Sequence, residues 1–425
     1  MGRRTLSLHD TVTLGEVSAA TAPRKLRMAL RTRHAAALGV ALFLAMLPVT
    51  MMVPVLKELI SDRFAAGSFW THSFMSMNMI GAVLFAPLGG ALADRLGRRK
   101  PILIVAACCD ALLLWLMPYL TSLGLLLSIR FLEGGAHILV VTALMAMAGD
   151  WADPKRPGRM MGVIGATLIF GTACGAPLGG RIGEYMPVLV FRIGAGLSLT
   201  VAILAMIVLR EGPMRPLAGR LRDALGLLKQ RRELLVPYAY AFIDRFCVGV
   251  IVSGFVLFLG EVHGLSPASR GGLLALFLFP FAFLCYPMGR LSDRIGRVMP
   301  MCAGSIGFGF VYASYGVLPS DLLPAAMVLS GVLSAAMFAP NLAMCADLAP
   351  AKHRATVYAG FNVAGSLGFI CGPLVSGWVC GALAYRSDPL LAYQTAFLIA
   401  GGAEVLCALV SLPWLLRLRR EGRTR

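Results

Sequence analysis

The sequence is poor in charge. Only 14% of its 425 residues are Asp, Glu, Lys or Arg, against roughly 25% in an ordinary soluble domain. By contrast, 58% are hydrophobic and the mean hydropathy is +0.77. Such a chain cannot cover itself with polar surface, so most of its solvent must be lipid. The net charge of +18 does not indicate nucleic-acid binding, because the basic residues lie in the gaps between apolar runs.

The motifs of soluble catalysis are also missing. There is no G-x-x-x-x-G-K-[ST] loop, no nucleophile–base constellation and no hydrophilic region large enough to hydrolyse ATP. The ten cysteines, from Cys108 to Cys407, all lie inside apolar runs and show no metal-ligand spacing. We interpret them as small packing residues. The sequence therefore predicts neither an enzyme nor a protein that holds a metal or cofactor.

Long apolar runs dominate what remains. A spanning helix needs about 20 mostly apolar residues, and twelve runs meet that length, with Pro, Gly or charge at almost every break. They are 35–57, 69–92, 101–120, 122–149, 158–181, 188–209, 235–260, 268–290, 299–318, 322–347, 355–382 and 391–416. The predicted fold class is an all-α polytopic membrane protein with twelve transmembrane helices in two six-helix pseudo-repeats.

Three segments flank or join the runs. Residues 1–34 are polar and Arg-rich and predict a disordered cytoplasmic arm, with a membrane-surface helix near 24–33 as the alternative. The first apolar run is a full span in length, so we expect it to be retained rather than cleaved. Residues 210–234 alternate basic and leucine residues at helical spacing, which predicts a basic amphipathic linker helix on the cytoplasmic surface. Residues 417–425 form a short tail. The bundles predicted between these segments are 35–209 and 235–416.

The basic residues also set the orientation. With the N-terminus inside, 31 Lys and Arg fall on the inner side and five on the outer side. Positive residues concentrate on cytoplasmic loops. Both termini are therefore expected in the cytoplasm of a plasma (inner) membrane protein.

Two halves of the chain repeat each other. The turn Gly90–Lys100 returns, shortened, as Gly289–Arg297, and Asp94 and Asp293 are 199 residues apart. Asp150 and Asp347 end two spans 197 residues apart, and so do Gly175 and Gly372 within two others. Internal repeats take priority in reading a fold. Paired membrane halves are the plan of secondary transporters.

These motifs resemble those of the major facilitator superfamily, in particular its drug/proton antiporters. The turn after the second span is similar to that family's G-x-L-a-D-r-x-G-r-k signature, and Arg130–His137 resembles its span 4 motif. The span 5 glycines resemble G-x-x-x-G-P-x-x-G-G, except that Ala176 intervenes before Pro177. The resemblance implies a small-molecule transporter with two six-helix bundles.

The resemblance also implies a role for the charged turns. Asp94 is expected to meet the start of span 11 near Thr356–Ala359, with Arg98 bridging to Asp150. By the repeat, Asp293 should approach Arg159–Gly162, with Arg297 near Asp347. We hypothesise that these contacts latch the cytoplasmic side closed. The candidate gating residues are Asp94, Arg95, Arg98, Asp150, Asp293, Arg294, Arg297 and Asp347.

The glycine-rich stretches have a packing interpretation. Small residues let helix backbones approach closely, and internal prolines remove hydrogen bonds and can bend a helix. We expect helix packing and bending from Gly171, Gly175, Pro177, Gly179, Gly180, Gly372 and Pro373.

Charges inside the spans are costly and are functional candidates by default. Arg130, Glu133 and His137 share one helical face. Arg130 and Glu133 could form a self-neutralising pair that only fixes packing, or the group could form a proton or substrate relay. Asp244 and Arg245 lie near mid-depth in span 7. These five are the candidate coupling or substrate residues, with Glu133 and Asp244 as the leading protonatable groups.

Two further acids lie alone in their spans. Asp110 is in span 3 and Glu404 in span 12. We expect a structural or lipid-edge role for these two as readily as coupling. Span 1 holds no acid between Ala35 and Lys57, which counts against a simple exporter of cations.

The sequence therefore favours a secondary active transporter that works by alternating access, with proton-coupled efflux of a small molecule. The alternatives are proton-coupled uptake, uniport, or a receptor or scaffold that keeps the fold without flux. The expected partners are a small-molecule substrate, protons and the lipid bilayer. We expect a monomer that binds no nucleic acid.

Overall fold

The computed structural model describes the chain except residues 1–23, 153–156, 213–220, 350–352, 385–387 and 423–425. The side chains described also exclude 24–32, 94, 157–159, 221–225, 355 and 384. Throughout the described part the secondary structure is helical, with no strand. Among the described residues, eleven helices are long and apolar enough to cross a membrane, and Val298–Ser314 is a shorter apolar twelfth. The predicted fold class is confirmed.

The first half contains six spanning helices. They are α1 (Arg24–Met51), α2 (Ser68–Leu96), α3 (Lys100–Leu116), α4 (Leu123–Trp151), α5 (Pro157–Tyr185) and α6 (Leu189–Ile207). The second half begins with α8 (Leu235–Val250) and α9 (Val256–Glu261), which share one span. It continues with α10 (Pro267–Ile295), α11 (Val298–Ser314), α12 (Leu323–Leu348), α13 (Arg354–Ala384) and α14 (Pro389–Arg420).

The predicted boundaries differ from these at both ends. Residues 24–34, assigned to the arm, form the first turns of α1, because they contain neither Gly nor Pro and continue directly into the span. Helix α14 runs to Arg420, beyond the expected end at 416. The rest of the arm lies outside the described residues. The linker contains a helix, α7 (Leu221–Gln230), that covers only part of 210–234.

The first span of each half is interrupted near the same end. In the first half, α1 gives way to short turns at Val53–Val55 and Lys57–Asp62, the second of them a π-helix. In the second half, α8 and α9 are separated by the π-helix Ile251–Phe255. A π-helix widens the turn and is frequent at functional positions.

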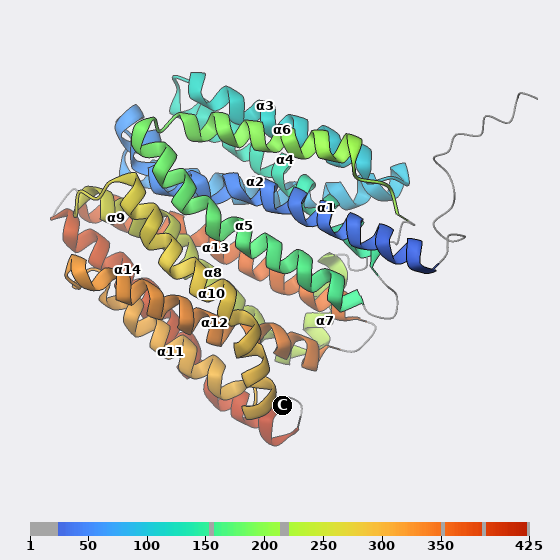
Figure 1. Cartoon of the computed structure of the whole chain (residues 1–425). Helices are drawn as coiled ribbons and strands as arrows, with labels where there is room; N and C mark the ends of the chain where they lie inside the picture. The colour runs from blue at the N-terminus through green and yellow to red at the C-terminus, as the bar shows by residue number, and fades with distance from the viewer. Residues whose placement is uncertain (1–23, 153–156, 213–220, 350–352, 385–387, 423–425) are drawn as a thin grey trace, which may run out of the picture.

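The halves pair their helices in the same way. In the first half α1 packs on α5, α2 on α4, and α3 on α6. In the second half α8 packs on α13, α10 on α12, and α11 on α14. Between the halves, α5 packs on α10 and α2 on α13. Figure 1 shows the blue-to-green first half lying alongside the yellow-to-red second half.

The buried apolar side chains form three clusters, and their positions distinguish the two ends of the bundle. We call the end where α2 passes into α3, and α10 into α11, the charged-turn end. At the opposite end one cluster draws on both halves, including Met51, Phe74, Phe258 and Phe397. At the charged-turn end each half has a separate cluster. The halves therefore share a core at one end only.

Candidate functional site

The halves touch closely at the opposite end. The Ser76 hydroxyl on α2 donates to the carbonyl of Ile370 on α13, at 2.8 Å. A Cβ on Gly377 would lie 2.8 Å from the Cβ of His72, and one on Gly180 would lie 2.4 Å from the Pro267 carbonyl oxygen. Real Cβ atoms do not approach so closely, so both crossings between the halves require glycine.

The remaining predicted packing residues lie within the halves. Cβ atoms on Gly171, Gly175 or Gly179 would collide with the backbone of α1, and one on Gly372 with the backbone of α8. Pro177 and Pro373 lie inside α5 and α13.

An ion pair also joins the halves at the opposite end. Arg270, near the start of α10, donates from Nη2 to Glu58 of the π-helix Lys57–Asp62. The Arg270 side chain is 1% exposed and that of Glu58 is 24% exposed. Neither residue was singled out in the sequence, where Arg270 counted only as one of five outer basic residues. The available signal was an Arg one turn inside a span, where a charge needs a partner.

At the charged-turn end, Arg99 holds the turn between α2 and α3 against the end of α4. Gly97, with φ of 61°, caps α2 in the left-handed conformation that favours glycine. Arg99 then precedes α3, and its Nε lies 2.7 Å from Asp150 at the end of α4. Both side chains are almost completely buried. The expected bridge from Arg98 to Asp150 is therefore wrong: Arg98 is exposed and Arg99 takes that place.

The second turn is one residue shorter. Gly296, with φ of 94°, is followed directly by Arg297, which precedes α11. Arg297 lies 3.2 Å from Asp347, as the repeat predicts, and 2.5 Å from Asp293. Both Arg99 and Arg297 stand immediately before their next helix. Arg297 therefore corresponds in space to Arg99, whereas the sequence alignment paired it with Arg98.

Among the described side chains, the expected contact of Asp293 with the first half is absent. The Asp293 carboxylate is 54% exposed and pairs with Arg297 of its own half. At the start of α5, a Cβ on Gly162 would meet no atom within 4 Å. The partner expected for Asp94, the start of α13, packs on its own half, since Tyr238 of α8 donates to the Val357 carbonyl at 2.9 Å. The Asp94 side chain itself lies outside the described residues.

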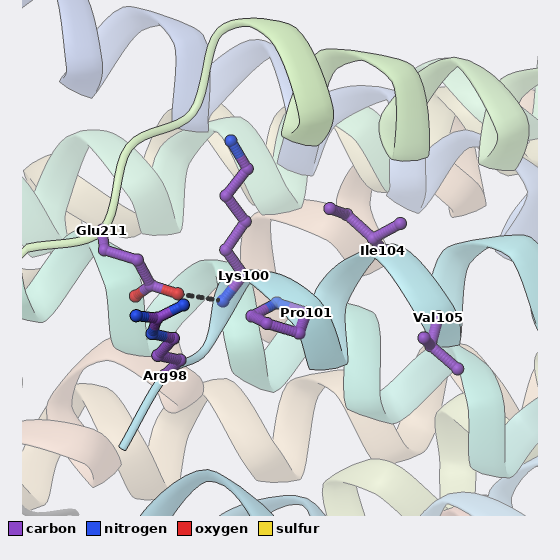
Figure 2. Close-up of a pocket in the computed structure, with 6 residues that line it drawn as sticks. All are labelled: Arg98, Lys100, Pro101, Ile104, Val105 and Glu211. Carbon is purple, nitrogen blue, oxygen red and sulfur yellow. Dashed lines mark hydrogen bonds between the residues drawn. The ribbon is translucent and has the colours of Figure 1, made fainter. Parts of the chain in front are cut away.

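Arg95 and Arg294 are exposed at this end, and Arg98 lines a surface pocket of about 540 Å³ with Lys100, Pro101, Ile104, Val105 and Glu211. Figure 2 shows the Glu211 carboxylate facing the start of α3. It accepts from the backbone N–H groups of Lys100, at 2.6 Å, and Arg99, at 3.0 Å. A carboxylate satisfies the free N–H groups and the positive dipole at a helix start. At this pocket, Glu211 therefore hydrogen-bonds the segment after α6 to the start of α3.

A buried charge cluster lies within the first half. Arg130 donates to Glu133 at 2.7 Å on α4, and the Asn78 amide on α2 donates to the same carboxylate oxygen at 2.7 Å. The Arg130 guanidinium also lies 4.9 Å from the centre of the Phe74 ring. Glu133 thus has both a cation and an amide donor.

The same cluster includes Asp110 from α3. Its Oδ2 accepts from the Ser198 hydroxyl of α6 at 2.5 Å and lies 3.9 Å from His137 Nδ1. One donor atom each from Asp110, Glu133 and His137 lie within 4.8 Å of one another, a spacing that could hold a metal ion. Asp110 is therefore neither alone nor at a lipid edge. The sequence could not show this, because the partners come from three other positions along the chain.

The second half holds a different arrangement. Asp244 is buried and lies 3.8 Å from Arg245, whose side chain is 40% exposed and stacks 5.3 Å from the Phe338 ring centre. Glu404 on α14 is fully buried rather than at a lipid edge. It accepts from the Ser305 hydroxyl of α11 and from the Cys247 thiol of α8, the latter at 3.6 Å.

Two six-helix halves with the same internal pairing, with charge confined to the turns and a few buried clusters, define a polytopic membrane transporter. The family model of the Major Facilitator Superfamily matches residues 38–259 and 237–425. The chain belongs to that superfamily. It is accordingly an integral membrane transporter of small molecules and not an enzyme.

Curated relatives and solved structures agree with this assignment. The multi-drug resistance efflux pump PmrA of Streptococcus pneumoniae is 24% identical over 84% of this chain and 91% of its own. The class G tetracycline resistance protein of Vibrio anguillarum is 26% identical over 82% and 92%. The fold matches a bacterial homologue of the human lysosomal transporter Spinster in an inward-facing, occupied conformation, with a TM-score of 0.76, 16% identity and coverage of 92% and 97%. It also matches the nucleoside transporter NupG, with a TM-score of 0.73, 15% identity and coverage of 90% and 98%.

Proposed function

We propose that this protein exports small amphipathic molecules in exchange for protons, by alternating access between its two halves. The observation that carries the proposal is the asymmetry of the two ends. The halves share one buried core at the opposite end and have separate cores at the charged-turn end. A pair of rigid halves that meets at one end is what rocking about a central site requires.

The orientation follows from the basic residues. Lys and Arg gather in the segments at the charged-turn end, and positive residues mark the cytoplasmic side. In this orientation the end with separate cores faces the cytoplasm, and the end where the Glu58–Arg270 pair and the glycine crossings join the halves faces outside, which favours an inward-open arrangement. Closure of the cytoplasmic side would bring Asp94 and Asp293 to the opposing half in the alternate state.

Export is favoured over uptake by the relatives. Two of them are named as efflux or resistance proteins and match most of this chain. The imperfect antiporter motif around Gly175 points the same way. Proton coupling is supported by the buried ionisable side chains of the first half, since such groups within spans commonly relay protons.

The test is drug accumulation in a host strain lacking its own efflux pumps. Cells expressing this protein should accumulate less tetracycline than empty-vector cells, by at least about threefold, and a protonophore should abolish the difference. Asp94→Asn at matched expression is the transport-defective comparison. Unchanged accumulation of every compound in a broad panel would reject export, and efflux insensitive to the protonophore would reject proton coupling.

A further inference from the structure

The charges of the buried cluster on α4 do not balance without a proton. Asp110, Arg130, Glu133 and His137 are 2%, 1%, 3% and 9% exposed. With His137 neutral, two carboxylates and one guanidinium leave a net charge of −1. A buried uncompensated charge is strongly unfavourable. One added proton makes the cluster neutral.

The geometry divides the cluster into two pairs. The charge of Glu133 is compensated by the Arg130 guanidinium, which donates to Oε2 at 2.7 Å, and the Asn78 amide donates to the same oxygen at 2.7 Å. Asp110 has a hydroxyl donor, Ser198, and no cation except the one that His137 becomes when protonated. The uncompensated negative charge therefore lies on the Asp110–His137 pair.

Among the side chains that the structure describes, the neighbouring helices supply no other charge to this pair. From α2 come Asn78 and the Phe74 ring, from α6 comes Ser198, and from α4 itself come Arg130 and Glu133. Among the described side chains of α1 and α5, none is within hydrogen-bond distance of Asp110 or His137. The protonation state of the Asp110–His137 pair is thus determined by the charges of the cluster itself.

Two polar atoms of this pair remain without a hydrogen-bond partner among the described residues. Asp110 Oδ1 and His137 Nε2 are buried and have no hydrogen-bond partner in the described part of the chain. His137 Nδ1 and Asp110 Oδ2 are 3.9 Å apart, beyond the roughly 3.2 Å limit of a good hydrogen bond. A small ring rotation would bring a protonated imidazole into contact with the carboxylate.

A divalent cation is the competing occupant. The three donor atoms are close enough together for one. However, the Arg130 guanidinium lies 2.7 Å from Glu133 Oε2, and its positive charge would repel a divalent cation bound to the same carboxylate. A proton needs only the Asp110–His137 pair and leaves the Arg130–Glu133 pair intact.

We propose that Asp110 and His137 form the proton-binding site of the transport cycle, beside a fixed Arg130–Glu133 pair. This inference rests on the proposed proton coupling. It puts the Asp110–His137 pair in place of Glu133, which the sequence favours together with Asp244 as a protonatable group. A proton from hydronium on one side forms an N–H bond at the free nitrogen of the His137 ring, beside the Asp110 carboxylate. That N–H bond breaks when the proton passes to water on the other side, which returns the imidazole to its neutral form.

The test measures how the conformation of the protein responds to pH, so that no substrate needs to be known. Spin labels carried by non-canonical amino acids at Leu96 and Ile295, both exposed and in different halves, leave the ten native cysteines untouched. In nanodiscs the populations with the shorter and the longer distance between the two labels should change in ratio by at least about threefold between pH 5 and pH 9. Asp110→Asn and His137→Gln should reduce that change below about 1.5-fold. Glu404→Gln, a buried acid in the other half, should keep it.

Each outcome decides the proposal. Loss of the pH response in Asp110→Asn and its recovery in Asp110→Glu support it, and the recovery shows that misfolding is not the cause. A full pH response in either cluster variant overturns it, as does a wild type with no response. Zinc or manganese that raises the unfolding temperature of wild type but not of His137→Gln would also overturn it. The protonophore experiment judges proton coupling separately, so a failure here leaves that result standing.

Discussion

The two ends of the bundle satisfy their charges in opposite ways. At the charged-turn end each half closes its own ion pair, Arg99 with Asp150 and Arg297 with Asp347. At the opposite end Glu58 and Arg270 form a pair that crosses between the halves. Breaking a buried pair leaves an uncompensated charge. The halves can therefore separate at the charged-turn end without such a cost, whereas separation at the opposite end must open an ion pair and a shared core.

The largest effect is expected from breaking the crossing pair. Arg270→Ala leaves Glu58 without its cation and should destabilise the closed opposite end by a few kcal/mol, enough to shift its population by more than about tenfold. Cys380, buried in the shared core at that end, should then react with a membrane-impermeant maleimide.

The exchanged pair is the control for that experiment. Glu58→Arg combined with Arg270→Glu should restore protection of Cys380, and Cys380→Ser should remove the labelling signal. Equal labelling in wild type and Arg270→Ala would show that the pair does not hold this end closed.

The next largest effect contrasts two neighbouring arginines. Arg99→Ala should destabilise the protein by about 3–5 kcal/mol, because it leaves Asp150 buried without this partner. Arg98→Ala removes an exposed side chain and should change stability by no more than about 0.5 kcal/mol. Thermal unfolding in detergent measures both, and a larger loss in Arg98→Ala would restore the pairing that the sequence suggested.

This contrast also shows how far the sequence could predict the structure. The twelve spans and the two halves follow from apolar runs and repeat offsets. The Arg297–Asp347 contact follows from the family resemblance, carried to the second half by the repeat. The Arg99 pairing does not, because Gly97 and Gly296 have different backbone conformations and one turn has an extra residue. Aligning the two motifs residue by residue hides this shift of one residue.

The candidate coupling residues show that sequence spacing also fails to predict contacts between different helices. The sequence groups Arg130, Glu133 and His137 through their helical spacing, but spacing within one helix cannot bring in Asp110 or Ser198 from two others. Likewise, Glu58 and Arg270 are 212 positions apart and belong to different halves. Contacts that depend on how two helices or two halves pack are set by tertiary structure, which no local pattern contains.

A moderate effect is expected at the glycine crossings. Gly377→Ala would place a Cβ 2.8 Å from the Cβ of His72 and should weaken closure of the opposite end by about 1–3 kcal/mol. Gly381→Ala, one turn further along α13, would place its Cβ 4.0 Å from the nearest atom and should be tolerated. Maleimide labelling of Cys380 compares the two, and equal labelling would mean that the crossing is not tightly packed.

The smallest effect on stability is expected at Asp293. Its carboxylate is 54% exposed and its pair with Arg297 lies within one helical turn, so Asp293→Asn should cost no more than about 0.5 kcal/mol. Asp347→Asn, whose carboxylate is 26% exposed, should cost more. If Asp293 meets the first half when the charged-turn end closes, Asp293→Asn should still slow drug efflux several-fold at unchanged unfolding temperature. Normal efflux in this variant would mean that Asp293 serves only to hold Arg297, and that closure of the charged-turn end uses other contacts.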